Sequence, residues 1–382
     1  MTDRKTIEKF SNLPTPFYFY DLDVLNKTLT SLKKESDNSG FKVHYAVKAN
    51  ANPRILKIIS SYGFGADCVS WNEIEAAMNA GFRACDIVFA GVGKSDREIE
   101  AALKADIFCF NCESIPEMEV INHFASLQNK SARIALRINP LIDAHTHHYI
   151  TTGIEESKFG IHTWELDEVL RRAGQMKNID LTGMHFHIGS QITKMSVFQR
   201  LCNQINELCE WFISRNVNLK VINVGGGLGI DYNNPDKEPP FADYFTLLND
   251  FIDLRQGQKL HLEPGRAIAG QCGSLISKVL YIKSGKNTMF AIIDAGMTDL
   301  IRPALYQAHH KIENLTSRGS VCRYDVVGPV CESADTFAKY IELPETRRGD
   351  IIAIRSAGAY GEVMASRYNL RDLPRAVFSD EL

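Results

Sequence analysis

The chain has 382 residues, more than the roughly 250–300 at which a single hydrophobic core stops growing, so we expect two domains or one barrel with a sizeable appendage. Hydrophobic residues make up 45% of the chain and charged residues 23%, which excludes global disorder. The 43 basic and 46 acidic side chains give a formal net charge of −3, and no long basic run is present. Binding to nucleic acid or to an anionic membrane surface is therefore not expected.

The sequence carries no signal for export. No apolar run approaches the ~18 residues of a membrane-spanning helix, and Met1–Phe17 lacks the apolar centre of a secretion signal. Nine cysteines are scattered without a disulfide framework, which is typical of a reducing compartment. We therefore expect a cytoplasmic protein. Cys109 and Cys112 form a C-x-x-C pair, but without a second such pair we expect no metal site there.

Short apolar, β-branched segments alternate with amphipathic stretches of helical period through the first two thirds of the chain. Such an alternation predicts βα units and a parallel sheet. The count of eight favours a closed (β/α)8 barrel, although an open, doubly wound sheet has the same local pattern. The predicted strands are Lys42–Val47, Gly65–Val69, Ile87–Gly91, Ile107–Phe110, Arg133–Ile138, Leu181–His187, Lys220–Val224 and Lys259–Leu262.

Polar and glycine-rich residues follow these predicted strands. Barrel enzymes build their sites from the loops at the carboxyl ends of the strands, so we expect these residues to gather on one face. The main groups are Lys48-Ala49-Asn50, Gly189-Ser190-Gln191, Gly225-Gly226-Gly227 and Glu263-Pro264-Gly265-Arg266. The long connection after the fifth strand contains His145, His147 and His148, which could suggest a metal site but which we interpret as part of a solvated loop near the site.

After Arg266 the pattern changes to strands without long helices between them, and we expect an all-β second domain. Pro16–Tyr20, ahead of the first barrel helix Asp23–Glu35, is predicted to add a strand to it. The domains would then be a barrel at 23–266 and a β-rich domain at 267–382 joined by residues 1–22. Its other predicted strands are Ser274–Ile282, Thr288–Ile293, Arg323–Val327, Ile341–Glu342 and Asp350–Ile354.

The residues after the strands match the chemical needs of pyridoxal 5′-phosphate. Its aldehyde requires an amine, and Lys48 at a strand end would be held rigidly and partly desolvated, whereas an isolated lysine is more often simply exposed. The glycine triplet at 225–227 and Arg266 could bind the phosphate. Glu263 could keep the pyridine nitrogen protonated, although a surface salt bridge is the alternative role for such a residue.

His185 and His187 are two positions apart on a predicted strand, so their side chains would share a face. One imidazole could stack on the cofactor ring, or the pair could bind zinc. We favour stacking, because the adjacent Gly189-Ser190 offers phosphate-binding groups and no third metal ligand.

Several ordered motifs closely resemble those of the diaminopimelate decarboxylases, within the alanine-racemase-like (fold-type III) pyridoxal-phosphate enzymes. The resemblance spans nearly the whole chain. The motifs are His44-Tyr45-Ala46-Val47-Lys48-Ala49-Asn50, Ser157-Lys158-Phe159-Gly160, His187-Ile188-Gly189-Ser190-Gln191, Gly225 to Gly229, Glu263-Pro264-Gly265-Arg266, Arg302-Pro303-Ala304-Leu305-Tyr306, Gly328-Pro329-Val330-Cys331-Glu332-Ser333 and Gly358-Ala359-Tyr360-Gly361.

The resemblance implies a role for each matching residue. Lys48 would bind the cofactor covalently and Cys331 would be the proton donor, reaching the site of the partner subunit in a homodimer with shared active sites. His187 would stack on the ring, and Glu263 would face the pyridine nitrogen. The implied phosphate contacts are Ser190, Gly227, Gly265, Arg266 and Tyr360, and Gly225 and Gly226 are further cofactor-binding residues. The implied substrate contacts are Arg266, Arg302, Tyr306, Glu332 and Tyr360.

The expected reaction is the decarboxylation of meso-diaminopimelate, at its D-configured centre, to L-lysine. Its distal end is a second amino-acid head that requires both an arginine and an acid, and Arg302 and Glu332 provide them. The alternatives are a related decarboxylase acting on carboxynorspermidine, ornithine or arginine, or a non-catalytic relative, against which the presence of Lys48 and Cys331 argues. Racemisation would need a second base, for which only Cys331 or Tyr360 is available.

Overall fold

A computed structural model describes residues 4–140, 142 and 158–382. His145, His147 and His148 lie outside the described residues, and so does Ser157, the first residue of the Ser157-Lys158-Phe159-Gly160 motif. The chain divides into two compact units. The barrel unit comprises Leu29–Gly229 and Pro240–Gly265, and the second unit comprises Met1–Thr28, Ile230–Pro239 and Arg266–Leu382.

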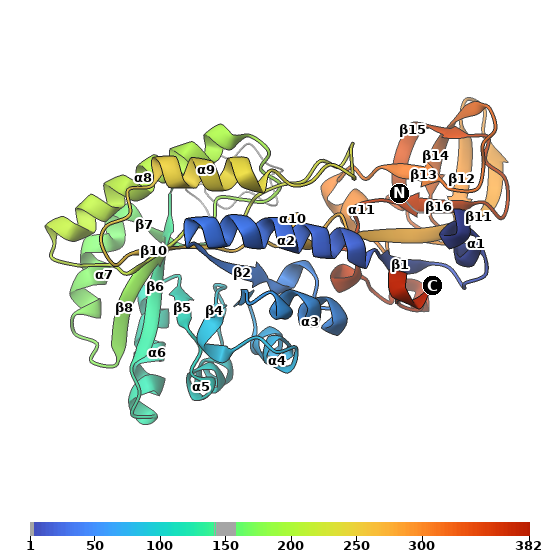
Figure 1. Ribbon diagram of the computed structural model, residues 1–382. Coiled ribbons are helices and arrows are strands. Elements are labelled where there is room, and N and C mark those ends of the chain that lie inside the picture. The colour runs from blue at the N-terminus through green and yellow to red at the C-terminus, as the bar shows by residue number, and fades with distance from the viewer. Residues whose placement is uncertain (1–3, 141, 143–157) are drawn as a thin grey trace. The chain divides into compact units, whose positions relative to one another are not determined.

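The barrel unit is a closed parallel sheet (Figure 1). Within the described residues its strands pair in the order β5-β4-β3-β2-β10-β9-β8-β6, and β5 also pairs with β6, which closes the ring. The short β7 (Ile161–His162) pairs with β6 outside this ring. The expected (β/α)8 barrel is thus confirmed. Its strands are β2 (Lys42–Ala46), β3 (Gly65–Cys68), β4 (Ile87–Phe89), β5 (Cys109–Cys112), β6 (Ala132–Asn139), β8 (Ile179–His185), β9 (Val221–Asn223) and β10 (Lys259–Leu262).

The predicted strand boundaries were wrong at several places. The strand expected at Leu181–His187 runs from Ile179 to His185, so His187 lies beyond its end. Phe186 and Ile188 remain fully buried after the strand, and for this reason hydrophobicity did not mark where the strand stops. The strand expected at Ile107–Phe110 begins two residues later, at Cys109.

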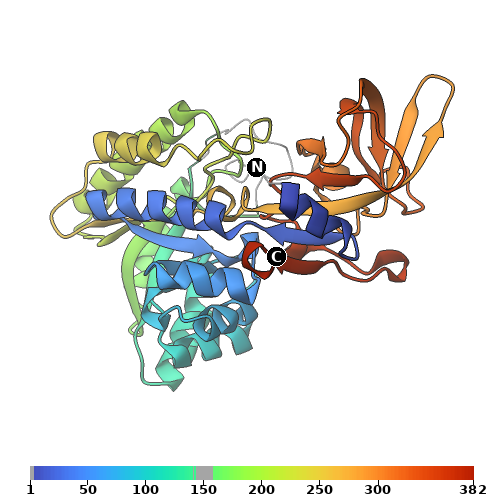
Figure 2. The same cartoon turned by 45° about the vertical axis from the view of Figure 1, so that its right-hand side comes forward.

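Eight helices in the described residues accompany the barrel strands, and α2 begins in the second unit (Figure 2). Several begin with the capping residues that helix starts favour: the side chains of Asn52, Ser70 and Ser114 accept the backbone N–H of Arg54, Glu73 and Glu117. The helices are α2 (Leu22–Ser39), α3 (Pro53–Ser61), α4 (Trp71–Asn79), α5 (Asp96–Ala105), α6 (Ile115–Leu127), α7 (Leu166–Ala173), α8 (Met195–Ser214) and α9 (Phe241–Phe251).

The second unit is built mainly on one mixed sheet, in which β1 lies between β11 and β17. β1 is antiparallel to β11 and parallel to β17. The predicted extra strand near Pro16–Tyr20 is therefore present, whereas β13 and β17 were missed because each is only three or four residues long. The strands are β1 (Phe17–Tyr20), β11 (Gly273–Ser284), β12 (Met289–Ile293), β13 (Ile312–Asn314), β14 (Val321–Val327), β15 (Thr336–Pro344), β16 (Ile351–Ile354) and β17 (Arg375–Phe378).

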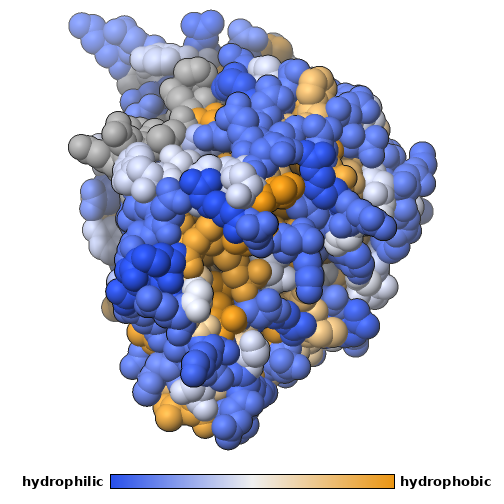
Figure 3. All heavy atoms as spheres, turned by 90° about the vertical axis from the view of Figure 1, so that its left-hand side faces the viewer, coloured by the Kyte–Doolittle hydropathy of each residue, from blue (hydrophilic) through white to orange (hydrophobic). Residues whose placement is uncertain are grey.

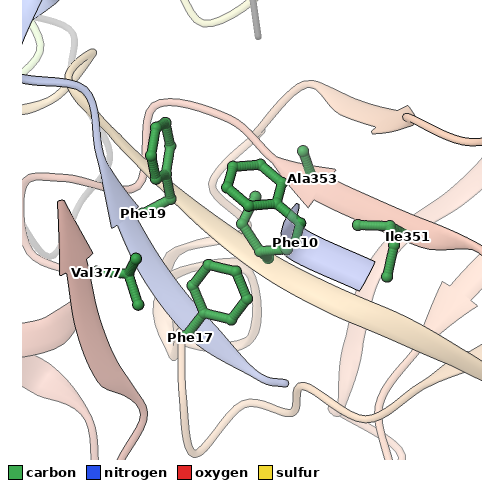
Figure 4. Packing of buried hydrophobic residues seen from close by; sticks show 7 residues of the cluster. Phe10, Phe17, Phe19, Ile351, Ala353 and Val377 are labelled. Carbon is green, nitrogen blue, oxygen red and sulfur yellow. The ribbon is translucent and has the colours of Figure 1, made fainter. Parts of the chain in front are cut away.

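Aromatic packing joins the N-terminal helix α1 (Arg4–Ser11) to this sheet (Figure 4). The ring of Phe10 lies 5.5 Å from that of Phe17 and 4.9 Å from that of Phe19, both in edge-to-face geometry. All three side chains are buried, together with Ile351 and Val377. Burying aromatic rings of this size contributes much of the packing energy of a small core, so α1 stabilises the sheet.

One face of the molecule is mainly hydrophilic, with apolar side chains gathered in a shallow hollow (Figure 3). Helices of the described part of the chain lack the length and apolar character needed to cross a bilayer.

Candidate active site

Lys48 lies in a single 3₁₀ turn (Val47–Ala49) that directly follows β2, at the carboxyl end of the barrel. Its Nζ is 3.0 Å from Oδ2 of Asp67 on β3, and the Lys48 side chain is 35% exposed while that of Asp67 is 0% exposed. Burial and the negative charge of Glu263 raise the pKa of Asp67, and the Lys48 ammonium opposes this shift. The barrel therefore holds one accessible amine against a buried carboxyl group.

Glu263 follows the end of β10 and is 4% exposed. Its Oε1 accepts hydrogen bonds from Asn223 Nδ2 (2.7 Å) and Asn111 Nδ2 (3.2 Å), and its Oε2 lies 2.9 Å from His185 Nε2. A carboxylate has about four lone-pair directions, so three donors leave one for a ligand. Glu263 is thus a buried, oriented acceptor and not the surface salt bridge that was the alternative interpretation.

His185 makes the largest contribution to keeping this buried carboxylate charged. Burial alone would raise the pKa of Glu263, but the positive charge and hydrogen bond of His185 lower it well below its ordinary value. His185 is itself 1% exposed, and its Nδ1 has no hydrogen-bond partner among the described residues. The two histidines predicted to share a face therefore have different surroundings, since His185 binds Glu263 and His187 lies after the strand.

The imidazole of His187 lies beside the glycine triplet, with its Cε1 3.8 Å from where a Cβ at Gly226 would be. Burial lowers the pKa of His187 well below its ordinary value, and the charges of Lys48 and Arg137 act in the same direction. The ring is therefore neutral, as a stacking partner for an aromatic ligand can be. Ser190, also expected at the site, lies three residues further along the same loop.

The glycine triplet is required by the close packing of three loops. A Cβ at Gly225 would overlap the carbonyl oxygen of Phe186, and one at Gly226 would overlap that of Glu263. Gly227, at φ +107°, lies against the carbonyl of Gly189. A Cβ at Gly265 would lie similarly close to Ala46 and Ala49, which flank Lys48. These glycines bring the loops after β2, β8, β9 and β10 into contact.

The described part of the Lys158-Phe159-Gly160 motif packs against a buried ion pair. Arg137 Nη1 lies 2.6 Å from Glu113 Oε1, and Oε2 of Glu113 accepts the backbone N–H of Gly160 at 2.9 Å. The guanidinium of Arg137 lies 4.7 Å from the centre of the Phe159 ring. The motif is therefore fixed to β6, from which Arg137 extends.

The second unit holds a pair of arginines joined by one phenol. Arg266 and Arg302 each donate an Nη1–H to Oη of Tyr232, both at 2.7 Å. Arg266 and Arg302 are 6% and 5% exposed, and Arg302 begins the short helix α11 (Arg302–Tyr306). The guanidinium of Arg266 lies 4.8 Å from the ring centre of Tyr360, which the sequence also placed at the site.

The remaining expected site residues lie on the surface of this unit or only partly inside it. Cys331 and Glu332 are both exposed, between β14 and β15, and Glu332 Oε1 accepts a hydrogen bond from Tyr368 Oη at 2.8 Å. Tyr306, at the end of α11, is partly buried. Exposure of Cys331 leaves its thiol accessible to a second chain.

The barrel residues fit pyridoxal 5′-phosphate. They provide an accessible amine, a buried carboxylate with an acceptor direction left over, a neutral imidazole and closely packed glycine loops with N–H groups for an anion. Sequence reasoning missed Asp67, Asn111, Asn223 and Tyr232 as parts of these groups. A carboxylate within the otherwise apolar strand Gly65–Cys68 was the signal that could have identified Asp67.

Comparison with known proteins agrees with this geometry. Residues 22–270 match the family model "pyridoxal-dependent decarboxylase, pyridoxal binding domain". The chain is 58% identical over 379 residues to a diaminopimelate decarboxylase of Bacteroides thetaiotaomicron, covering 98% of both chains. It is 42% identical over 368 residues to one of Helicobacter pylori, covering 95% of this chain and 90% of that one.

Solved structures give the same result. The fold matches a Helicobacter pylori diaminopimelate decarboxylase complexed with L-lysine at a TM-score of 0.92, with 41% identity over 97% of this chain and 93% of that chain. A lysine decarboxylase of Selenomonas ruminantium, 22% identical with a TM-score of 0.89, shares the fold. The chain therefore belongs to the pyridoxal-dependent decarboxylases and, within them, to the diaminopimelate decarboxylase family.

Proposed function

We infer that this protein is a pyridoxal-phosphate-dependent carboxy-lyase that converts meso-2,6-diaminopimelate to L-lysine and CO2. The observation that carries this conclusion is the 58% identity across 98% of both chains to a diaminopimelate decarboxylase. This reaction is the last step of lysine biosynthesis. The barrel residues described above supply the groups that the cofactor needs.

Each barrel residue then has a defined task. When bound, the cofactor's protonated pyridine ring accepts the electron pair left on Cα as the carboxylate leaves. Lys48 Nζ would bind the aldehyde carbon, and Asp67, 3.0 Å from that amine, keeps it in place. Glu263 would accept the pyridine N–H, and His187 would pack on the ring. We assign the phosphate to Ser190, Gly225, Gly226, Gly227, Gly265, Arg266 and Tyr360.

We propose that Arg302 binds the distal carboxylate of the substrate. Its guanidinium is buried, and among the described residues its hydrogen-bond acceptor is the Tyr232 phenol and not a carboxylate. A buried cation without a counter-ion is costly, so a ligand carboxylate would offset that cost. Glu332 would bind the distal ammonium, with Tyr306, Arg266 and Tyr360 as further contacts. A substrate such as ornithine, which lacks a distal carboxylate, would leave Arg302 unpaired.

We further propose that Cys331 protonates Cα, and that it does so in the site of a partner subunit, which makes the protein a homodimer. Supporting this role, its thiol is exposed in the single chain. We propose a cytoplasmic location because all nine cysteines are unpaired thiols, as is usual in a reducing compartment.

The test is an assay of purified protein with meso-diaminopimelate, ornithine and arginine, with and without added pyridoxal phosphate. We expect CO2 and L-lysine from diaminopimelate alone. Lys48→Ala should abolish turnover and also the visible absorbance of the lysine-bound cofactor. Preference for ornithine or arginine, or full activity of the variant, would overturn the assignment.

A further inference from the structure

Tyr232 is a residue of the second unit to which neither the sequence motifs nor the roles above give a task. It lies in the segment Ile230–Pro239, which belongs to that unit although the flanking residues belong to the barrel. The segment follows the glycine motif that ends at Gly229. The residue Tyr232 is partly buried, and both arginines that donate to its phenolic oxygen are buried.

The phenolic oxygen of Tyr232 is shared by two cations. A phenol oxygen offers acceptor capacity for two N–H donors, and Arg266 and Arg302 both use it at 2.7 Å. Burial acts to raise the pKa of Tyr232, but the two guanidiniums outweigh burial and lower it. The oxygen thus accepts from both cations and helps to hold two like charges close together.

The ring of Tyr232 is itself fixed. His310 packs against it edge to face, with 5.0 Å between ring centres and 81° between planes. His310 Nδ1 lies 2.9 Å from the carbonyl oxygen of Arg355, and because a carbonyl only accepts, Nδ1 carries the hydrogen. Burial and the charge of Arg302 lower the pKa of His310 to about 3, so this support does not change its charge near neutral pH.

Arg302 depends on Tyr232 more than Arg266 does. Among the described residues, the Arg302 guanidinium donates its hydrogen bond to Tyr232 Oη. The same guanidinium lies 5.5 Å from the centre of the Tyr232 ring. Arg266 has a second aromatic neighbour, Tyr360, at 4.8 Å. Removing the phenolic oxygen would therefore release Arg302 while Arg266 keeps part of its support.

We propose that Tyr232 is a positioning residue that sets specificity for a distal carboxylate, by using one oxygen to hold Arg302 in a fixed orientation beside Arg266. This proposal rests on the proposed function, in which Arg302 binds that carboxylate. A fixed guanidinium can bind a carboxylate through two parallel N–H bonds, and a mobile one loses that geometry.

The experiment compares Tyr232→Phe with Tyr244→Phe in the cofactor-loaded protein. Tyr244 on α9 is a matched control, because it is buried and its Oη has no partner among the described residues. We expect Tyr232→Phe to raise KM for meso-diaminopimelate about tenfold and to change kcat less than about threefold, as loss of a charge-assisted hydrogen bond in binding predicts. Tyr244→Phe should leave both constants unchanged.

Binding measured by calorimetry gives a second result that does not need turnover. Pimelate has two carboxylates on the substrate's carbon skeleton and hexanoate has one. Tyr232→Phe should weaken pimelate about tenfold and leave hexanoate unchanged. An unchanged Kd for pimelate would overturn the proposal, and so would equal weakening of both acids, which would indicate a general structural role.

A variant of Arg302 guards against the case in which Tyr232→Phe unfolds. Arg302→Lys keeps the charge but loses the planar fork, so it should show the same selective loss of pimelate binding. If both single variants fold, the double variant should bind pimelate no more weakly than Arg302→Lys alone. Losses of binding free energy that add up in the double variant would contradict the proposal. If the wild-type protein binds pimelate but releases no CO2 from diaminopimelate, the proposed function is wrong. The binding experiment still tests the role of Tyr232 in that case, because it does not require turnover.

Discussion

A buried carboxylate at a cofactor site must be both charged and correctly oriented. His185 helps to keep Glu263 charged and also fixes its orientation. It donates to Oε2 at 2.9 Å, and its charge holds the pKa of Glu263 well below the value that burial would otherwise impose. Asn111 and Asn223 bind the other oxygen and supply orientation without charge. His185 therefore makes the largest contribution to keeping Glu263 charged, and Lys48 adds to it.

We expect His185→Gln to lower kcat about tenfold, the lower end of the range found when a residue orienting a liganding group is removed. Glutamine retains a donor but cannot carry a positive charge, so the pKa of Glu263 should rise. The pH at which the visible cofactor band changes should then shift, which a spectrophotometric pH titration measures. His123→Gln on the exposed face of α6 is the control. A titration curve identical to that of the wild type would show that His185 has no electrostatic role.

The residues that the sequence identified are those with a local signature. Lys48, Glu263 and the glycine triplet follow strand ends, and their neighbours are fixed by the loops that glycine permits. Asn223 and Tyr232 carry no such signature, because their partners lie far away in the chain: Asn223 bonds to a residue 40 positions away, and Tyr232 bonds to residues 34 and 70 positions away. Long-range pairing of this kind depends on the folded topology, which residue spacing does not reveal.

At the scale of elements, the loop after β9 is limited by backbone contacts with its neighbours. We expect Gly226→Ala to weaken pyridoxal phosphate binding at least about tenfold, because the added methyl group would displace the Glu263 backbone and overpack a close approach. Fluorescence titration of the apoprotein with the cofactor measures this. Gly93→Ala, where an added Cβ meets no atom within 4 Å, should bind as the wild type does. Equal affinity of both variants would refute the role of this contact.

The start of α4 contains a carboxyl group with an unusual titration. Burial raises the pKa of Glu73 to about 7, and the hydrogen bond from the Val69 backbone N–H only partly opposes this. The folded-state pKa of Glu73 lies above its unfolded-state pKa, so protonated Glu73 favours the folded protein. This contribution to the free energy of unfolding is complete below the unfolded-state pKa and is lost as pH rises through 7.

We therefore expect the melting temperature of the wild type to fall between about pH 6 and 8. The melting temperature of Glu73→Gln should fall by about 2–4 °C less over the same range. Differential scanning calorimetry at constant ionic strength tests this, with the exposed Glu75→Gln on the same helix as the control. Parallel pH profiles for Glu73→Gln and wild type would contradict the assignment.

Periodicity predicted the elements of the barrel better than those of the second unit. Barrel strands are buried and separated by helices, and each has a parallel neighbour on both sides. β13 and β17 have three and four residues, too few to show alternation, and they depend on β16 and β1 for pairing. The predicted division of the chain into 23–266 and 267–382 stays a prediction.

For the whole molecule, a shared active site makes a specific prediction. Lys48→Ala and Cys331→Ala should each be almost inactive, since one lacks the amine and the other the proposed proton donor. Mixed under conditions that allow subunit exchange, they should recover about a quarter of wild-type activity, because half of the dimers would be mixed and each would hold one intact site. Activity assays before and after mixing measure this. No recovery in mixtures proven to exchange would place Cys331 in its own subunit's site or remove it from the reaction.

The pairing of β1 with β17 sets an order for folding during synthesis. β1 is translated early, yet it completes its hydrogen-bond ladder only when Gly273–Ile276 and Arg375–Phe378 have left the ribosome. The barrel unit contains no residue beyond Gly265, so it can fold while the strands from β11 onward are still unmade. Phe17 and Phe19, which the folded sheet buries, lack that cover during the interval, so the nascent chain presents an aromatic segment on which aggregation can begin.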